Sequence, residues 1–289
     1  MIGRNPQVVT SSDVTVSRST NIGTRRRNRT QLIFVQFAIL LGFLLSWEFL
    51  PKIMWMRDTF TFLDPYFISS PSETFQTLRQ LAVGNGSVTM WSYASSTITA
   101  SLIGIVLGTA LGAGGGLLLS NNQQLSDVLR PFILAANAIP RIALIPVIVI
   151  LFGPTLQASI FTAVTVVFFV VFFNAYEGGR SVSDDVLENS RLLGASRSQL
   201  MWQVRGPYVV AWTITSLPNA VSFGLVSVVT AEILTGTVGM GRLLLDSVTT
   251  VQSSLTFAVV VVLSVLGVVL VAVAEVLRTH LLHWWSDGK

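Results

Sequence analysis

Long apolar runs alternate with short polar segments along most of this chain. Crossing the hydrocarbon core of a bilayer takes about 20 apolar residues in a helix, and several runs reach that length with almost no charge. One very large buried core is the alternative, but uncharged runs of this length favour membrane spans. The pattern therefore predicts an all-α, polytopic membrane protein with six transmembrane helices. The expected spans cover about residues 31–50, 91–119, 131–152, 155–175, 208–233 and 255–281.

The composition agrees with a membrane protein and excludes several kinds of chemistry. Only 11% of the 289 residues are charged, whereas a soluble domain carries about 25%. The sequence has no cysteine, which excludes disulfides, thiolate catalysis and zinc–cysteine sites. Neither Lys52 nor Lys289 lies in the glycine-rich pattern that cradles ATP phosphates, so any ATP must be bound by another chain. A metal pair is one alternative for His280 and His283, and two interfacial side chains are the favoured interpretation.

Basic residues set the expected orientation in the membrane. Residues 1–30 are polar, lack periodicity and carry six arginines, which is typical of a disordered tail beside anionic lipid. The apolar run that follows is too long for a signal-peptide core and lacks a small-residue cleavage site, so an uncleaved first span is expected. With the N-terminus inside, thirteen Lys and Arg residues lie on the inner side and four on the outer side. This bias predicts cytoplasmic N- and C-termini, and it accounts for the net charge of +4 without a nucleic-acid partner.

The outer segment between the first two spans contains a short helical pattern. Ser72 is the expected N-cap, and Phe75, Leu78 and Leu81 recur at helical spacing behind it. An amphipathic helix over residues 72–84, lying at the outer interface, is the favoured interpretation. Contact of this helix with an external binding protein is the alternative.

Four glycines recur every four residues along one face of the second span. They are Gly104, Gly108, Gly112 and Gly116. Small residues at this spacing allow two helix backbones to approach closely. We expect structural packing against another helix, and a glycine-lined pore wall is the alternative.

Residues 181–207 form a polar segment between two long apolar runs. Serine and acidic residues at its start are typical of a helix N-terminus. Gly194 can end that helix in the left-handed conformation, and Ser196 with Gln199 three residues on predicts a capping box for a second helix. Pro207 is expected to close the unit before the next span. Two helices floating on the lipid surface are the alternative, but a rigid, angled pair favours docking in a groove of a partner protein.

The same segment carries a resemblance to a known family. Its sequence, ENSRLLGASRSQLMWQVRGP, is similar to the signature loop of permease subunits in ABC importers. The segments NAIPRIALIPVIVILFGP, TAEIL and TVGMGRLLLDS extend the likeness and resemble the branch with aliphatic sulfonate, taurine, nitrate and pyrimidine-precursor permeases. This chain departs from the family pattern at Asn189 and Ser190, where two alanines are usual, and at Gly206, where leucine is usual. The resemblance implies ATPase-coupling roles for Glu188, Leu192, Gly194, Ala195, Ser196, Gln199 and Pro207.

The resemblance also implies a fold, a set of partners and a cellular location. Residues 31–289 would form a type I ABC importer-like transmembrane permease domain, with residues 181–207 as its cytoplasmic coupling loop. The implied partners are two ABC ATPase subunits that carry ATP and Mg²⁺, a second copy or a similar permease, and a periplasmic or lipid-anchored solute-binding protein. This chain would hold no cofactor and catalyse no reaction. The implied function is import of a small solute, with an anion as one alternative, across a prokaryotic inner membrane.

Charged and proline residues inside the spans are the candidates for a translocation pathway. Arg141 falls within the third span, where a cation costs roughly 2.5 to 3.5 kcal/mol, so it should face the bundle interior or a water-filled cavity. A structural partner, such as a backbone carbonyl freed by a nearby proline, is favoured over attraction of an anionic substrate. Pro218 should break or kink the fifth span, and Glu232 and Glu275 are expected to be interfacial. The candidate pathway residues are Arg141, Pro140, Pro146, Pro218 and Asn219.

An ion-coupled secondary transporter is the alternative function. Such a protein needs titratable or ion-coordinating groups deep in its spans. The sequence offers Arg141 there without a mid-membrane carboxylate, which favours coupling to a separate ATPase instead. A membrane enzyme is disfavoured because no nucleophile has a nearby base in the sequence.

Overall fold

The computed structural model describes residues 29–53, 67–84 and 89–285. The chain divides into two compact units, and the boundary in the sequence lies between Ser46 and Trp47. All regular structure in the described ranges is helical, in agreement with the predicted all-α class. The predicted disordered tail lies outside the described residues, except for its last two positions, where the first helix begins.

The first unit contains most of α1 (Arg29–Phe49). Its side chains are exposed from residue 31 to residue 45, and this surface is almost entirely apolar. A helix that is hydrophobic on all faces is typical of a membrane span. The last residues of α1 and the 3₁₀ helix η1 (Leu50–Lys52) belong to the second unit.

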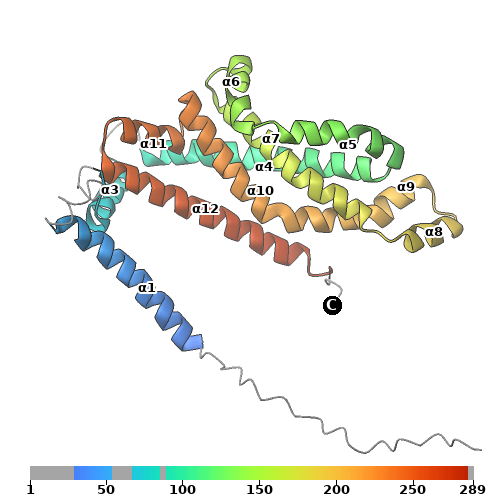
Figure 1. The fold of residues 1–289 in the computed structure, drawn as a ribbon, viewed down its shortest axis with the longest axis horizontal. Coiled ribbons are helices and arrows are strands. Elements are labelled where there is room, and N and C mark those ends of the chain that lie inside the picture. The colour runs from blue at the N-terminus through green and yellow to red at the C-terminus, as the bar shows by residue number, and fades with distance from the viewer. Residues whose placement is uncertain (1–28, 54–66, 85–88, 286–289) are drawn as a thin grey trace, which may run out of the picture. The chain divides into compact units, whose positions relative to one another are not determined.

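The second unit is a bundle of helices of very different lengths (Figure 1). Three long helices, α4, α7 and α10, pack together at its centre, and α12 lies along α10. The short helices α8 and α9 lie at one end of this unit, and α3 and α11 lie at the other end. The helices are α3 (Pro71–Val83), α4 (Met90–Ser120), α5 (Gln123–Ala138), α6 (Arg141–Phe152), α7 (Leu156–Arg180), α8 (Asp184–Leu192), α9 (Arg197–Gln199), η3 (Leu200–Arg205), α10 (Gly206–Thr235), α11 (Met240–Thr249) and α12 (Ser253–Leu281).

Within the described residues, five helices are long and apolar enough to cross a membrane, or six if α5 and α6 are one span. α5 and α6 meet at a bend of 87°, so the predicted third span at 131–152 is not one continuous helix. Ile139 precedes Pro140, and the proline ring disfavours helical backbone at the preceding residue. Ile139 is accordingly extended, with ψ of 125°, and it ends α5. Most residues on both sides of Ile139–Pro140 are apolar, so a hydropathy profile shows no sign of the bend.

The predicted closure of the coupling segment at Pro207 is also wrong, because the helix continues from Arg197 to Thr235. η3 is a π-helical turn, and the Gly206 N–H donates to the carbonyl of Met201, five residues back. Proline has no N–H to lose, and a wider turn just before it relieves the clash of its ring with the preceding turn. Pro218, where a break or a kink was predicted, does not end the helix, since α10 passes through it.

The glycine face of α4 packs directly against α7, as predicted, and forms no pore wall within the described part of this chain. A Cβ atom at Gly104 would lie 2.4 Å from Cβ of Ala163, and one at Gly112 would lie 2.7 Å from the carbonyl oxygen of Phe168. Gly108 and Gly116 face Val167 and Ala175 in the same way. Only glycine allows these two backbones to lie so close.

We expect replacement of Gly112 by leucine to destabilise the bundle by about 1–3 kcal/mol, because the new side chain would collide with the α7 backbone. The matched control is Gly114→Leu, since Gly114 is exposed on the same helix and a Cβ there would meet no atom within 4 Å. Thermal unfolding of the detergent-solubilised protein measures both. Equal midpoints for the two variants would contradict this account of α4–α7 packing.

The predicted outer helix exists as α3, but its N-cap is Ser70 and not Ser72. Pro71 occupies the first helical position, where its missing N–H costs nothing. The Ser70 hydroxyl accepts a 3.3 Å hydrogen bond from the Glu73 N–H. α3 packs on α12, and it leaves Phe75 69% exposed, so the predicted apolar face is only partly buried.

Candidate functional site

The two-helix elbow at residues 181–207 has the local geometry that its sequence predicts. Gly194 has φ of +89°, in the left-handed region. The Gly194 N–H donates to the carbonyl of Arg191 at 2.9 Å, and the Ala195 N–H donates to that of Ser190 at 3.0 Å. This pair of bonds is a Schellman motif, which satisfies the last carbonyls of α8 and turns the chain sharply.

The second helix of the elbow begins with the predicted capping box. The Ser196 hydroxyl accepts from the Gln199 N–H at 3.3 Å, and the Gln199 side-chain oxygen accepts from the Ser196 N–H at 2.8 Å. Two N–H groups that a helix start leaves free are thereby satisfied. The corner between the two helices is therefore fixed on both sides of Gly194.

Apolar residues of the elbow divide into a buried set and an exposed set. Val182, Leu187 and Leu200 are buried together and hold α8 against η3. Leu192 and Leu193, in contrast, are 85% and 89% exposed. Beside these leucines lies a depression of about 290 Å³ between the two helices. It is lined by Ser190, Leu193, Gly194, Ala195, Gln199, Gln203 and Val204.

The structure places the predicted coupling residues on one elbow with different exposures. Glu188, Leu192, Gly194, Ser196 and Gln199 are exposed. Ala195 is half-buried in the turn, and Pro207 is half-buried in the first turn of α10. Pro207 is the last residue of the elbow, and the others lie on α8, in the turn after it and on α9.

Arg205 is a residue of the same segment that sequence reasoning did not single out. Its Nη1 donates to the carbonyl of Ser120, the last residue of α4, which is 85 positions earlier in the chain. Its Nε is buried and finds no hydrogen-bond partner among the described residues. The residues around Arg205 in the sequence do not predict this contact, because the contact depends on how α10 packs against α4.

Arg141 lies at the first residue of α6, directly after the bend, and is half-buried. Its guanidinium donates to the side-chain oxygen of Asn137 and lies over the Phe169 ring, 5.4 Å from its centroid. These groups, and not the expected backbone carbonyl, are its partners. Its Nε is buried without a hydrogen-bond partner in the described part of the chain, so one donor remains available.

The other pathway candidates are spread over two helices. Pro140 is the N-cap of α6, and Pro146 lies inside that helix. Pro218 and Asn219 lie on α10, half-buried and exposed respectively. The hydrogen-bond and ring partners of Arg141 lie on α5 and α7, so these contacts do not join it to the α10 pair.

Glu232 is fully buried in the bundle, with 0% of its surface exposed, and its expected position near the membrane interface stays a prediction. The Thr97 hydroxyl donates to its carboxylate at 2.9 Å, and the Gly241 N–H donates to it at 2.9 Å. The same Thr97 oxygen accepts from the Met240 N–H at 2.8 Å. The carboxylate thus joins α10, α4 and the start of α11.

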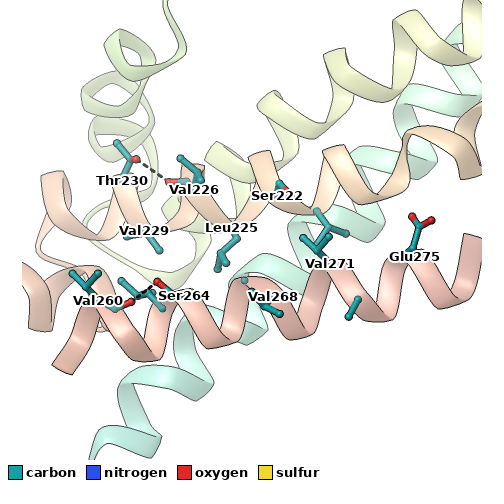
Figure 2. A pocket seen from close by; sticks show the side chains of 14 residues that line it. Ser222, Leu225, Val226, Val229, Thr230, Val260, Ser264, Val268, Val271 and Glu275 are labelled. Atoms are coloured by element: carbon teal, nitrogen blue, oxygen red, sulfur yellow. Dashed lines mark hydrogen bonds between the residues drawn. The ribbon is translucent and has the colours of Figure 1, made fainter. Parts of the chain in front are cut away.

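An apolar groove of about 880 Å³ runs between α10 and α12 (Figure 2). Valine and leucine side chains from both helices line most of it, and Ser222, Thr230 and Ser264 add hydroxyls. Glu275 lies near one end of the groove and pairs with Arg278 at 3.1 Å. A surface of this character requires an apolar cover, either protein or lipid.

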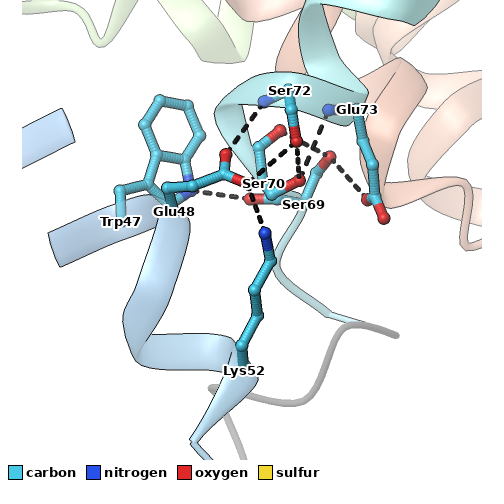
Figure 3. Close-up of polar contacts among 7 residues, drawn as sticks. All are labelled: Trp47, Glu48, Lys52, Ser69, Ser70, Ser72 and Glu73. Carbon is cyan, nitrogen blue, oxygen red and sulfur yellow. Dashed lines mark hydrogen bonds and ion pairs between the residues drawn. The ribbon is translucent and has the colours of Figure 1, made fainter. Parts of the chain in front are cut away.

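A polar cluster joins the start of the second unit to α3 (Figure 3). The Ser72 N–H and hydroxyl donate to the Glu48 carboxylate at 3.1 Å and 3.0 Å. The Trp47 indole N–H donates to the carbonyl of Ser69 at 2.6 Å. Lys52 pairs with Glu48 at 2.5 Å. The role expected for Ser72 as a helix cap is therefore replaced by one in fastening α3 to residues 47–52.

Long apolar helices that pack through glycine faces, with a rigid polar elbow at one end, define a multi-pass membrane protein of the transport permease class. Residues 104–285 match the family of binding-protein-dependent transport system inner membrane components, and the chain belongs to that family. The match begins in α4 and ends after α12, so it includes the elbow, Arg141 and Glu232.

Relatives and a solved structure agree with this assignment. The chain is 23% identical to the taurine transport system permease protein TauC of Escherichia coli, over 81% of this chain and 86% of that protein. It is 25% identical to the formylaminopyrimidine transport permease protein ThiX of Halalkalibacterium halodurans, over 80% and 91%. An inward-facing structure of the MetNI methionine ABC transporter has the same fold, with a TM-score of 0.57 at 16% identity, over 64% of this chain and 92% of that chain.

Proposed function

We propose that this chain forms the translocation pathway of an ATP-driven importer for a small anionic solute. In this proposal an external solute-binding protein delivers the solute, and two separate ABC ATPase subunits supply ATP hydrolysis with their own ATP and Mg²⁺. A second copy of this chain, or a similar permease, completes the pathway in a prokaryotic inner membrane. The N- and C-termini and the elbow are placed on the cytoplasmic side, on the basis of the excess of Lys and Arg there.

The observation that carries this proposal is the rigid, exposed elbow. Its corner is fixed by the Schellman motif and the capping box, and its own small core of Val182, Leu187 and Leu200 holds the two helices together. Leu192 and Leu193 remain almost fully exposed at the corner. A stiff element with apolar tips suits transmission of force from a partner protein, because the tips gain free energy only when a partner buries them.

Arg141 and the names of the relatives support an anionic solute. TauC is named for transport of taurine, which carries a sulfonate group, and a further relative is the nitrate import permease protein NrtB of Synechocystis, 25% identical over 60% of this chain and 62% of that protein. Arg141 keeps one buried N–H donor free in the described structure. A half-buried guanidinium beside a helix break is suited to attract an anion by its charge, and we assign Pro140, Pro146, Pro218 and Asn219 to the surrounding pathway.

The direct test is copurification of the tagged chain from detergent extracts. We expect an ABC ATPase subunit to accompany it, and ATP hydrolysis of the reconstituted complex to rise when binding protein and solute are added. A chain that purifies alone, and drives solute uptake from an ion gradient without ATP, would instead establish the ion-coupled transporter.

We expect the double substitution Leu192→Asp and Leu193→Asp to weaken ATPase binding at least about tenfold. Burying a leucine stabilises a complex by roughly 1.5–3 kcal/mol, and an aspartate at either tip would have to be desolvated on docking. Copurified ATPase per permease measures the effect. The matched control is Val248→Asp, because Val248 is also exposed but lies on α11 at the opposite end of the unit. Undiminished copurification of the double variant would contradict docking at these leucines.

A further inference from the structure

α4 and α10 lie antiparallel, and a charged side chain of α10 or of the turn before it contacts α4 at each end of the pair. At one end Arg205 reaches Ser120, the last residue of α4. At the other end Glu232 reaches Thr97, near the start of α4. At 1.5 Å per residue, about 40 Å of helix separates the two charged residues. We call these contacts the elbow clamp and the far clamp.

The elbow clamp supplies a hydrogen-bond donor to the free carbonyl groups at the C-terminal end of α4. The last four carbonyls of α4 have no N–H partner within the helix, and the C-terminal end of a helix carries partial negative charge. The Arg205 guanidinium donates to one of these carbonyls and brings positive charge to that end. Gly179 of α7 lies close by, since a Cβ there would be 2.1 Å from the Ser120 hydroxyl oxygen. The contact is therefore enclosed by three helices.

The far clamp satisfies a buried carboxylate with neutral donors. The Gly241 N–H lies in the first turn of α11, where the helix dipole favours negative charge. Thr97 donates to the carboxylate and also accepts from the Met240 N–H, so it links α4 to α11. A Cβ at Gly239 would lie 2.1 Å from the carboxylate, which explains a glycine at that position. Separation of α11 from α10 would leave a buried carboxylate without these donors, at high cost.

The space between the clamps is tightly packed. Ile105 of α4, Val167 of α7 and Ala220 of α10 belong to one buried cluster. A Cβ at Gly224 would lie 2.9 Å from the Ile105 side chain, so α10 has no room to slide against α4 there. Densely packed interiors have low compressibility and transmit strain from one helix to the next.

We propose that Arg205 and Glu232 are positioning residues that lock α10 to both ends of α4, so that displacement of the elbow is delivered to α11 at the opposite end. This inference rests on the proposed function, in which an ATPase moves the elbow. α4, α7, α10 and α11 then form one lever. Its long arm is the uninterrupted helix from Arg197 to Thr235, which passes through both Pro207 and Pro218.

The test uses the complete importer complex in proteoliposomes, with solute transported per ATP hydrolysed as the readout. We expect Arg205→Met and Glu232→Ala each to lower this ratio at least about fivefold, within the range of ordinary allosteric coupling. Arg205→Lys and Glu232→Gln keep a donor and an acceptor at the two clamps and should restore most of the ratio. The charged control is Arg278→Met on α12, which removes a half-exposed ion-pair member outside the lever and should leave the ratio unchanged.

A variant that carries both substitutions distinguishes one shared lever from two independent local defects. Residues this far apart that act independently have effects that multiply. If both clamps act on one lever, losing either clamp already uncouples it. The double variant Arg205→Met, Glu232→Ala should then transport about as much solute per ATP as the worse of the two single variants. A multiplied loss, or single variants with the wild-type ratio, would overturn the proposal. If Glu232→Ala does not assemble, Thr97→Val removes the bridging hydroxyl at similar volume and gives the same comparison.

A distance measurement tests the lever without relying on transport. The chain has no cysteine, so Asp185→Cys on α8 and Val248→Cys on α11 accept spin labels cleanly. We expect the distance between these labels to be the same with and without ATP in the wild-type background, and to become ATP-dependent in Glu232→Ala. An ATP-dependent distance in the wild-type background would refute the lever. A wild-type complex without ATP-dependent uptake would refute the proposed function itself, which is a separate outcome.

Discussion

Replacement of Gly194 by valine is expected to lower solute transport per ATP about tenfold while membrane insertion stays intact. The φ of +89° at Gly194 is strained for any β-branched residue, at a cost of about 1–3 kcal/mol. Free space surrounds the position, since a Cβ there would meet no atom within 4 Å. The effect therefore comes from backbone conformation alone: the corner of the elbow opens, and each 1.4 kcal/mol corresponds to about a factor of ten.

The matched control for this prediction is Gly194→Asn. Asparagine enters the left-handed region more readily than other side-chain-bearing residues, so it should retain most of the coupling while adding similar bulk. ATP hydrolysis and uptake are measured together in the reconstituted complex. If the valine variant transports as much solute per ATP as the asparagine variant, the left-handed corner at Gly194 is not needed for coupling.

Replacement of Arg141 by methionine is expected to reduce uptake of an anionic solute by roughly tenfold or more, with the ATPase still bound. Methionine preserves much of the packing against Phe169 but removes the charge and the free N–H donor. A hydrogen bond to a charged group contributes about 1.5–3 kcal/mol, which corresponds to a factor of roughly ten to a hundred. Uptake across a concentration series, alongside copurified ATPase, measures both quantities.

Arg141→Lys provides the control, because it keeps the positive charge and loses the planar fork that donates to Asn137 and stacks on the ring. An anion-attracting role predicts partial uptake in the lysine variant and little in the methionine variant. Loss of assembly in both variants would identify Arg141 as a structural tie between α5, α6 and α7. An equal fractional loss of uptake for anionic and neutral solutes in the methionine variant would likewise count against an anion site.

The elbow was predictable because its contacts are local. The left-handed Gly194 and the Ser196–Gln199 box depend on residues within five positions of each other, so the side-chain and backbone rules for helix ends apply directly. The glycine face of α4 was predictable for a related reason, since spacing along one helix shows which residues share a face. Sequence spacing could not identify α7 as the helix that this face meets.

The errors at prolines have a common cause. A proline in an apolar run suggests a break, but its effect depends on whether the surrounding turn can adapt. At Pro207 a π-helical turn precedes the ring, so the helix continues, whereas at Pro140 the preceding Ile139 becomes extended and the two helices meet at 87°. At Pro140 apolar residues continue on both sides, so spans counted from hydropathy did not show the bend. At Pro207 a polar segment gives way to an apolar run, which suggested an end that the continuous helix does not have.

Residue order along the chain was sufficient for the helical class, the number of candidate spans, the elbow and its caps, because each depends on periodicity or on neighbours a few positions apart. The two clamps required the folded bundle: Arg205 meets a residue 85 positions away, and Glu232 meets one 135 positions away. Burial of Glu232 could not be inferred from its place near a helix end, since burial is a property of all the helices that surround it. Contacts between distant segments arise from packing, and packing is settled only when every helix has found its neighbours.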